Sequence, residues 1–159
     1  MSKKYFDYYK SPIGILEITS DEDSILSVIF VDEEKQDIEF NKVPRILKKA
    51  YVQLDEYFKG KRNKFDLKIS FTGTDFQKKV WNELTNISYG EVVSYKYIAE
   101  KIGNEKAVRA IGNANSKNPI SIIVPCHRVI GANGSLTGYA GGIERKEWLL
   151  NHEKTFVSK

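Results

Sequence analysis

The sequence predicts an α+β protein of two domains: a small antiparallel sheet with one helix, then a mainly helical domain that carries a helix-turn-helix. Three observations support this prediction. Short runs of β-branched and aromatic residues fill the first third of the chain, and an amphipathic helical pattern follows them. The rest of the chain shows mostly helical patterns with cap and stop signals. The change of pattern near residues 71–74 predicts domains at residues 1–72 and 73–159.

Strand-like runs open the first domain: KYFDYYK, GILEITS and SILSVIFV. Turn-forming residues such as Ser11-Pro12 and Asp21-Glu22-Asp23 separate them, which predicts an antiparallel meander. The strands are expected at residues 4–10, 14–20 and 24–31.

Residues 44–59 form the helical pattern of this domain, because apolar side chains recur at spacings of three and four and Gly60 supplies a stop. Residues 64–69 resemble a further short strand. Nothing before residue 70 stands out chemically, so we expect this domain to support the second one. The positions expected to face inward on the helix are Leu47, Ala50, Tyr51, Leu54 and Phe58.

A capping box begins the first helix of the second domain, because Thr74 is followed three residues later by Gln77. The helix is expected to stop near residues 88–90, where serine, tyrosine and glycine follow its last apolar position. Its apolar face comprises Phe76, Val80, Leu84 and Ile87.

Two short helices follow, SYKYIAEKIG and EKAVRAIGNAN. Ser94 is the expected cap of the first, and Asn104 of the second. A turn of one or two residues at Gly103 and Asn104 matches helix-turn-helix spacing, which a generic helical hairpin shares. The second helix surrounds Arg109 with small residues, and these suit either plain helix packing or docking on a phosphate-lined groove. They are Ala107, Ala110, Gly112 and Ala114.

The remaining residues suggest a strand, a loop and a helix. Residues 120–124 (ISIIV) resemble a buried strand, and residues 135–142 (SLTGYAGG) are too glycine-rich for a regular element. Residues 143–153 are expected to form the final helix, with His152 on its surface.

Composition narrows the class of protein. No stretch approaches the roughly 20 apolar residues that span a bilayer, and the polar start has no signal-peptide core, so we expect a cytoplasmic protein without a membrane partner. One cysteine and two histidines leave neither an intramolecular disulfide nor an evident metal site. The net charge of +4 fits an ordinary solvated surface and also permits a nucleic-acid partner.

The lone cysteine lies in IVPCHRVIGANG, residues 123–134, directly before His127. A thiol is nucleophilic as the thiolate, and a neighbouring imidazole can remove its proton. Adjacent side chains of an extended segment point in opposite directions, which favours a relay through water over direct contact. Taken alone the pair is a weak motif, and a buried, inert Cys126 is the alternative.

Residues 76–153 as a whole resemble the O6-alkylguanine-DNA alkyltransferases, or methylated-DNA–protein-cysteine methyltransferases. The stretches GEVVSYKYIAEKIG, AVRAIGNANSKNP, VPCHRV and GYAGGIERKEWLLNHE carry the resemblance, in family order and close to family spacing. The strand-rich first domain is similar to the family's N-terminal domain, which is ribonuclease H-like. The resemblance implies DNA repair in which an alkyl group moves from O6-alkylguanine in duplex DNA to Cys126, irreversibly, once per molecule and without a cofactor. O4-alkylthymine is a further candidate substrate.

The resemblance also implies roles for residues around the cysteine. Cys126 is the alkyl acceptor, His127 is the base acting through a bound water, and Glu153 orients His127. Asn118 ties the cysteine turn to the helix-turn-helix. Lys146 lies nearby, although a solvated lysine on a charged helix face is the alternative.

DNA contacts follow from the same resemblance. Tyr95 contacts the flipped guanine and its 3′ phosphate, and Arg109 fills the gap that the base leaves in the duplex. The family places the small-residue helix in the minor groove of double-stranded DNA. The other DNA-contacting residues expected are Ala107, Ala110, Gly112 and Arg128.

The resemblance places further groups at the guanine pocket. Tyr139 forms its wall, and the backbone N–H of Ala140 points at the guanine oxygen. The backbone carbonyls of Cys126 and Val129 accept the exocyclic amine. Many relatives have serine where Ala140 stands, so a hydroxyl contact is absent at that position.

Two other functions stay open on the sequence: a module of the same fold that binds alkyl lesions without transfer, and an unrelated cysteine hydrolase. The presence of Cys126 speaks against the first. A Cys-His pair this close in sequence is unusual for the second. The N-terminal domain lacks the cysteines and histidines with which some relatives bind zinc, and we expect a monomer.

Overall fold

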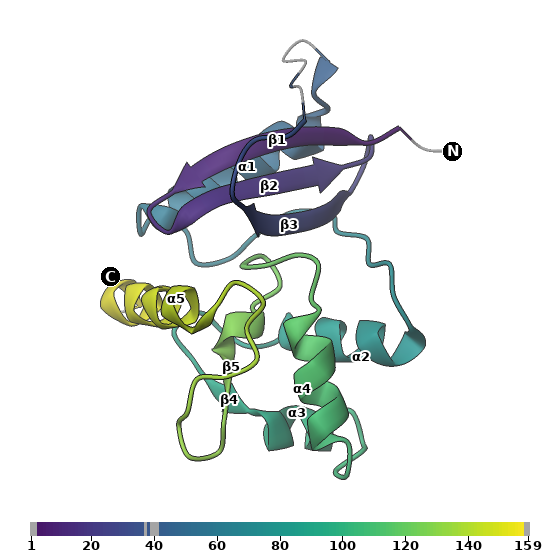
Figure 1. Ribbon diagram of the computed structural model, residues 1–159, viewed down its shortest axis with the longest axis vertical. Helices are drawn as coiled ribbons and strands as arrows, with labels where there is room; N and C mark the ends of the chain where they lie inside the picture. The colour runs from purple at the N-terminus through teal and green to yellow at the C-terminus, as the bar shows by residue number, and fades with distance from the viewer. Residues whose placement is uncertain (1–2, 37, 39–41, 158–159) are drawn as a thin grey trace. The chain divides into compact units, whose positions relative to one another are not determined.

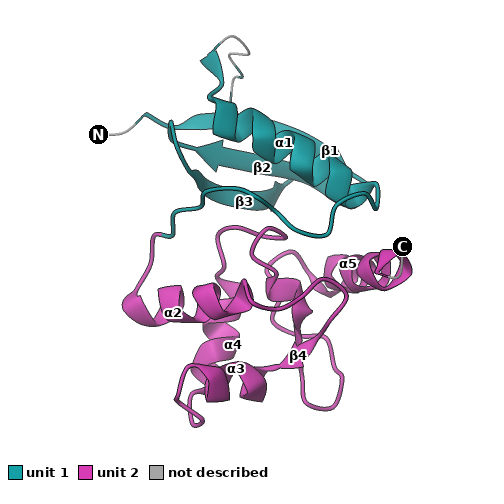
Figure 2. Ribbon diagram, turned by 180° about the vertical axis from the view of Figure 1, so that it is seen from behind, with its two compact units in different colours: residues 1–71 teal, residues 72–159 magenta. Residues whose placement is uncertain are grey.

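The computed structural model describes residues 3–36, 38 and 42–157. The chain divides into two compact units, residues 1–71 (unit 1) and 72–159 (unit 2), which are distinguished by colour in Figure 2. The division falls one residue before the boundary expected from the sequence. Within the described ranges, no helix is both long enough and apolar enough to cross a membrane.

Unit 1 is a three-stranded antiparallel sheet with one helix packed against it, as the sequence predicts (Figure 1). The strands lie in the spatial order β1-β2-β3. Leu16 and Ile18 alternate along the central strand and are fully buried, which gives the sheet its apolar face. The elements are β1 (Tyr5–Ser11), β2 (Gly14–Ser20), β3 (Ile25–Val31) and α1 (Arg45–Phe58).

Helix α1 buries most of the face that its spacing predicts, including Ala50 and Leu54, which are fully buried. Tyr51 differs from the prediction: it is 38% exposed, and its ring meets Tyr9 edge-on with 5.2 Å between centroids. Tyr57 takes the inward place instead and is fully buried. The reason is helical geometry, because residues 50, 54 and 57 share one face while residue 51 lies at its margin.

The strand predicted at residues 64–69 is wrong. This segment meets the sheet at one isolated parallel bridge between Ile69 and Ile25. Beside it, the Gln53 side chain accepts a hydrogen bond from the backbone N–H of Asp66 at 2.9 Å and donates to its carbonyl at 3.3 Å. A side chain therefore satisfies backbone groups that a strand neighbour would otherwise pair.

Unit 2 arranges four α-helices around a short parallel pair of strands. The predicted capping box is confirmed, with Thr74 and Gln77 exchanging two hydrogen bonds of 3.0 Å. Trp81, which the sequence did not single out, is buried and donates its indole N–H to the Ala114 carbonyl at 2.8 Å. The elements are α2 (Asp75–Leu84), β4 (Val93–Ser94), α3 (Tyr95–Lys101), α4 (Val108–Ser116), a 3-10 turn (Cys126–Arg128), β5 (Val129–Ile130) and α5 (Ile143–Phe156).

Helices α3 and α4 pack on one another as the helix-turn-helix, but the turn is longer than predicted. The Ser94 side chain caps α3 as expected, accepting a backbone N–H at 3.0 Å. Asn104 does not cap α4: its carbonyl accepts the N–H of Ala107 at 3.1 Å, and the helix begins only at Val108. A cap side chain must directly precede the first helical turn, and Ala107 occupies that place.

Two predictions in the last third of the chain are also wrong. Residues 120–124 form a tight turn with a bridge between Ser121 and Val124 in place of a buried strand. His152 is 7% exposed and not on the surface, because its ring stacks on Trp148 at 4.9 Å and α5 continues to Phe156.

Candidate active site

Cys126 begins the 3-10 turn directly after Pro125. The residue is 3% exposed, and burial raises the pKa of its thiol to about 11. The nearby Asn118 amide and the charge of Lys146 oppose this rise, because both favour the thiolate. The thiol is therefore protonated at neutral pH, and nucleophilic chemistry here requires a base.

Asn118 holds the turn that leads into the cysteine. Its Oδ1 accepts the N–H of Ile120 at 3.0 Å, and its Nδ2 donates to the carbonyls of Val124 and Ile120 at 2.9 and 3.2 Å. Within this turn Ile122 has a φ of 71°, a left-handed conformation that is strained for a β-branched residue. One buried amide thus holds the backbone between α4 and Cys126 in a conformation that it would not adopt unaided.

Asn115 is a site residue that the sequence reasoning missed. It is 1% exposed, and its Nδ2 donates to the backbone carbonyl of Cys126 at 3.2 Å. A possible signal was its place three residues before Asn118 at the end of α4, since residues three apart share a helix face. Asn115 thus links α4 to the backbone of Cys126, and Asn118, two residues beyond the end of α4, holds the strained turn.

His127 and Glu153 form a buried pair. His127 Nε2 lies 2.6 Å from Glu153 Oε2, and the two side chains are 0% and 1% exposed. Burial lowers the pKa of His127, although Glu153 works in the opposite direction. Burial also disfavours the carboxylate, yet His127 and Arg128 hold the pKa of Glu153 well below its usual range. With Glu153 ionised, Nε2 carries a proton, and the buried Nδ1, which has no hydrogen-bond partner among the described residues, presents its lone pair.

Arg128 lies inside unit 2, where it is 6% exposed. Its Nε and Nη2 donate to the two oxygens of Glu153 at 2.8 and 3.0 Å, and its Nη1 donates to the Ile87 carbonyl at 2.7 Å. The guanidinium carbon also lies 5.6 Å from the centroid of the Tyr89 ring. The expected contact of Arg128 with DNA does not fit this position, because all its side-chain nitrogens are engaged within the fold.

Comparison with protein families gives matches over both units. Residues 75–155 match the family model described as 6-O-methylguanine DNA methyltransferase, DNA binding domain. Residues 4–71 match the model for the ribonuclease-like domain of the same proteins. The chain belongs to the 6-O-methylguanine DNA methyltransferase family.

Similar proteins cover nearly the full chain. The methylated-DNA–protein-cysteine methyltransferase of Methanosarcina acetivorans is 49% identical over 156 residues, covering 94% of this chain and 97% of the relative. The constitutive enzyme of that name from Bacillus subtilis is 46% identical, with 94% and 95% covered. Among solved structures, Mycobacterium tuberculosis OGT in complex with DNA superposes with a TM-score of 0.87 at 42% identity, covering 96% of this chain and 94% of that one. The predicted α+β fold of this methyltransferase family is confirmed.

Lys146 of this methyltransferase is fully buried, so the alternative of a solvated surface lysine is wrong. Its ammonium donates to the carbonyls of Val129 and Thr137, the latter at 2.7 Å. Burial lowers the pKa of Lys146 to about 8, and the nearby Cys126 opposes this shift. The site therefore holds a cation close to the thiol.

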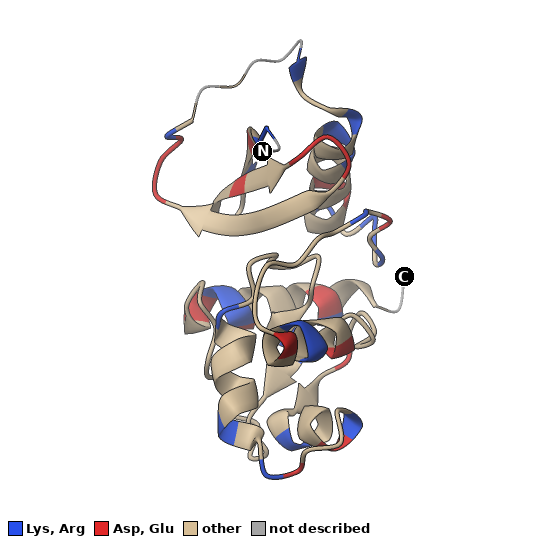
Figure 3. Cartoon of the chain, turned by 90° about the vertical axis from the view of Figure 1, so that its right-hand side faces the viewer, with Lys and Arg blue, Asp and Glu red and all other residues tan. Residues whose placement is uncertain are grey.

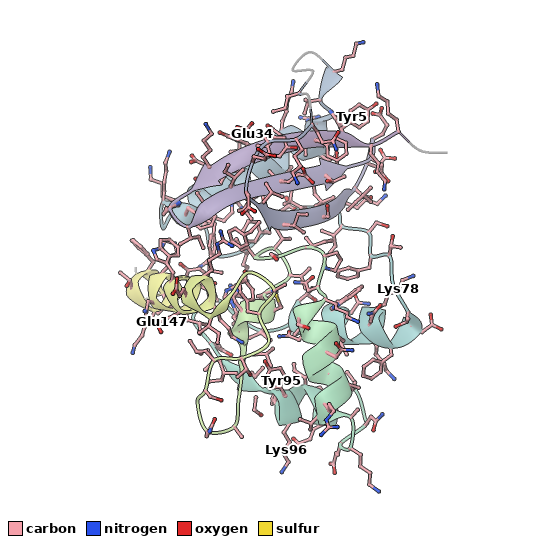
Figure 4. All side chains as sticks on the ribbon, in the orientation of Figure 1. Tyr5, Glu34, Lys78, Tyr95, Lys96 and Glu147 are labelled. Carbon is pink, nitrogen blue, oxygen red and sulfur yellow. The ribbon has the colours of Figure 1, made fainter. Side chains whose placement is uncertain are left out.

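Tyr95 lies between α4 and the loop after β5. Its hydroxyl donates to the Thr137 carbonyl at 2.8 Å, so Tyr95 and Lys146 converge on one acceptor. Figure 4 shows Tyr95 on the side of α3 that faces this loop. A Cβ on Gly138 would lie 2.9 Å from the Tyr95 hydroxyl, and one on Gly112 would lie 3.8 Å from its ring. The absence of side chains at Gly138 and Gly112 therefore leaves room for the Tyr95 ring between α4 and the loop.

Arg109 is exposed on the first turn of α4. The remainder of that helix has no charged residue, which Figure 3 shows as a tan ribbon with blue at one end. Ala110 is exposed as well, while Ala107 and Gly112 are half-buried. This surface suits the expected close approach to DNA, which stays a prediction.

Tyr139 and Ala140 differ in exposure. Tyr139 is 8% exposed, and burial, followed by the charge of Cys126, raises the pKa of its hydroxyl far above its usual range. Ala140 is exposed. In the part of the chain that the structure describes, no group of three or more His, Cys, Asp or Glu side chains could hold a metal ion.

Proposed function

We propose that this protein repairs DNA by transferring the alkyl group of O6-alkylguanine in duplex DNA to Cys126, once per molecule. The observation that supports this most directly is the buried His127–Glu153 pair at 2.6 Å beside the lone cysteine. Because the pKa of the Cys126 thiol is high, a base must remove its proton, and Nδ1 of His127 offers a lone pair for this step. Family membership supplies the substrate class, because the matched family is named for methylguanine in DNA.

The transfer step balances without a cofactor. His127 takes the thiol proton on Nδ1 through one bridging water. The Cys126 sulfur then attacks the alkyl carbon, so that an S–C bond forms while the O6–C bond breaks and its electron pair leaves with guanine. Hydrogen bonds from Tyr95 and from the N–H of Ala140 stabilise the charge on the departing base. The product is a thioether that no group at this site reverses, which limits each molecule to one reaction.

Base recognition uses the backbone of the same turn. The carbonyls of Cys126 and Val129 accept the exocyclic amine of guanine, with Tyr139 as the pocket wall. The Cys126 carbonyl already accepts hydrogen bonds from Asn115 and from the N–H of Val129, and the Val129 carbonyl accepts one from Lys146. Because a carbonyl has two lone pairs, the guanine amine must share or displace one of the two bonds at Cys126.

The alkylated base must leave the duplex to reach a cysteine that is 3% exposed. Extruding a nucleotide costs on the order of a few kcal/mol, and Arg109 replaces the base in the stack. The uncharged surface of α4 sits in the minor groove with Ala107, Ala110 and Gly112 against the backbone. A helix with few base-reading side chains suits a scanner of damage at any sequence.

The alternatives receive less support. A lesion-binding module without transfer has no need for the buried base beside Cys126. A cysteine hydrolase would turn over repeatedly and would need a route for water to an acyl intermediate. Beyond the chemistry, we expect the protein to act as a monomer in the cytoplasm, with O4-alkylthymine as a further substrate to test.

Intact mass after reaction tests the proposal. Incubation with excess duplex containing O6-methylguanine should add one methyl group to Cys126 and no more. Cys126→Ser, the matched control, should stay unmodified while still binding the duplex. Tight binding with an unchanged wild-type mass would support the lesion-binding module, and repeated turnover would support the hydrolase.

Methylation is also expected to destabilise the protein. The added methyl must fit into a site that is 97% covered in the native fold, and overpacking typically costs about 1–3 kcal/mol. A loss of this size should lower Tm by roughly 2–12 °C. Calorimetry of the protein before and after reaction, with DNA removed, measures it. Equal melting temperatures would show that the turn accommodates the methyl group without strain.

A further inference from the structure

We propose that Arg128 is a positioning residue that keeps His127 unprotonated, and so available as the base, by supplying the counter-charge of Glu153. This inference rests on the function proposed above and adds to it a residue that does not touch the substrate. It replaces the DNA contact that the sequence suggested for Arg128.

The geometry shows a carboxylate with donors on both oxygens. Glu153 Oε1 accepts from Arg128 Nε at 2.8 Å and from Gly90 N at 3.2 Å. Glu153 Oε2 accepts from Arg128 Nη2 at 3.0 Å and meets His127 Nε2 at 2.6 Å. The bidentate contact orients the carboxylate plane, and the carboxylate in turn orients the imidazole.

Charge balance decides the protonation of His127. A buried cluster that carries net charge is strongly disfavoured, so ionised groups occur in compensated sets. Arg128 and Glu153 cancel one another, which leaves a neutral imidazole as the resting state. Without Arg128, the carboxylate would be balanced instead by a proton on His127. An imidazolium has no lone pair at Nδ1 and cannot accept the thiol proton.

Other groups near the imidazole do not replace Arg128. Burial lowers the pKa of His127, Glu153 raises it, and the cations Arg128 and Lys146 lower it. The Lys146 ammonium donates to the backbone carbonyls of Val129 and Thr137. The charged and titratable groups facing the His127–Glu153 pair are Lys146 from α5, Arg128 and Cys126 from the turn of His127, Tyr89 from the segment before β4, and Tyr139 from the loop after β5.

The arrangement also keeps the proton transfer free of net charge. When the proton moves from Cys126 to His127, the imidazolium and the thiolate cancel, while Arg128 and Glu153 still compensate one another. After alkyl transfer the thioether is neutral, and the positive charge on His127 is balanced by the guanine anion until the base takes up a proton.

The first experiment compares Arg128→Met with Arg128→Lys. Each protein is titrated by NMR on its two histidines, with His127→Gln assigning the signals, and the single-turnover rate of methyl transfer is measured across pH. In Arg128→Met the pKa of His127 should rise, and transfer at a given pH should slow by up to tenfold for each unit by which the raised pKa exceeds that pH. Because a raised pKa leaves the base protonated below it, the rate should recover as pH increases. Arg128→Lys keeps the charge and should leave the His127 pKa close to that of the wild type.

A second comparison does not depend on the folding of Arg128→Met. Glu153→Gln leaves the positive charge of Arg128 beside His127, and adding Arg128→Met removes that charge. The pKa of His127 should therefore be higher in the double variant than in Glu153→Gln. Arg62→Met, which removes an arginine bound to Glu56 in unit 1, is the matched control and should change neither readout.

A purely structural role would give a different pattern. Transfer would then slow by the same factor at every pH, with the His127 pKa unchanged in all variants, and the proposal would be overturned. Failure of the proposed function is distinguishable, because it would appear as an absence of methyl on Cys126 in the wild-type protein.

Discussion

Replacing Glu153 with alanine is expected to lower the free energy of unfolding by about 3–5 kcal/mol. The carboxylate is 1% exposed and receives hydrogen bonds from Arg128 and Gly90 while it pairs with His127. Without it, the Arg128 guanidinium stays buried with no counter-charge, which is the costly half of a broken ion pair. Urea unfolding measures the loss, and alkyl transfer should fall with it because His127 loses its orientation.

Glu147→Ala is the matched control on the same helix. Glu147 is exposed on α5, where Figure 4 labels it, and a surface substitution of this kind changes stability by roughly 0.5 kcal/mol or less. Equal losses in the two variants would mean that the helix itself, and not the buried ion pair, accounts for the effect.

The stabilisation by Glu153 should depend on pH. Its pKa is held well below the ordinary value of 4.5, so the native carboxylate binds fewer protons than the unfolded one. Its contribution is therefore fully present above about pH 4.5 and is lost as the pH falls toward the folded-state pKa. The difference in unfolding free energy between wild type and Glu153→Ala should shrink in acid, and a constant difference would contradict the assignment.

Asn118→Ala is expected to lower the free energy of unfolding by about 2–4 kcal/mol. The substitution leaves buried backbone groups without a hydrogen-bond partner, which costs roughly 1–3 kcal/mol for each group. The amide pairs with Ile120 and Val124 and holds a turn in which Ile122 is left-handed. Alkyl transfer should slow by more than the stability loss alone explains, since the same turn positions Cys126. Stopped reactions quantified by mass, on samples shown to be folded, measure the rate.

Two further variants sharpen this prediction. Asn118→Asp keeps the acceptor for Ile120 but loses both donors, so its stability should lie below that of the wild type at neutral pH. Asn113→Ala removes an exposed asparagine from α4 and should leave stability unchanged or slightly raised, because alanine favours a helix. A fully active and stable Asn118→Ala would show that the turn holds its conformation without the amide.

Local patterns predicted much of this fold. The strand β2, the capping box at Thr74 and the Ser94 cap were all expected, because each depends on residues close together in the chain. The segment at residues 64–69 shows the limit of that approach. Its apolar residues resemble a strand, but Gln53 from α1 bonds the backbone at Asp66, and no local pattern includes a side chain thirteen positions away.

The candidate site shows the same division. Cys126, His127, Glu153 and Asn118 were expected from motifs, and the structure brings them together within unit 2. Asn115 was missed, because a helix pattern does not reveal that its amide reaches the Cys126 carbonyl. The 120–124 turn was mistaken for a strand, because a run of apolar residues carries no sign of a single left-handed isoleucine.

The sequence by itself determined the family, the order of the elements and the nucleophile, because these are properties of neighbouring residues and of motif spacing. Only the tertiary structure decided which charged residues are buried and which partners they have. The sequence suggested a DNA contact for Arg128 and left open a solvated surface position for Lys146. Both are buried, Arg128 on a carboxylate and Lys146 on backbone carbonyls. The physical reason is that burial and counter-charge come from residues far away in the chain, and these two quantities set whether a group is charged and what it can do.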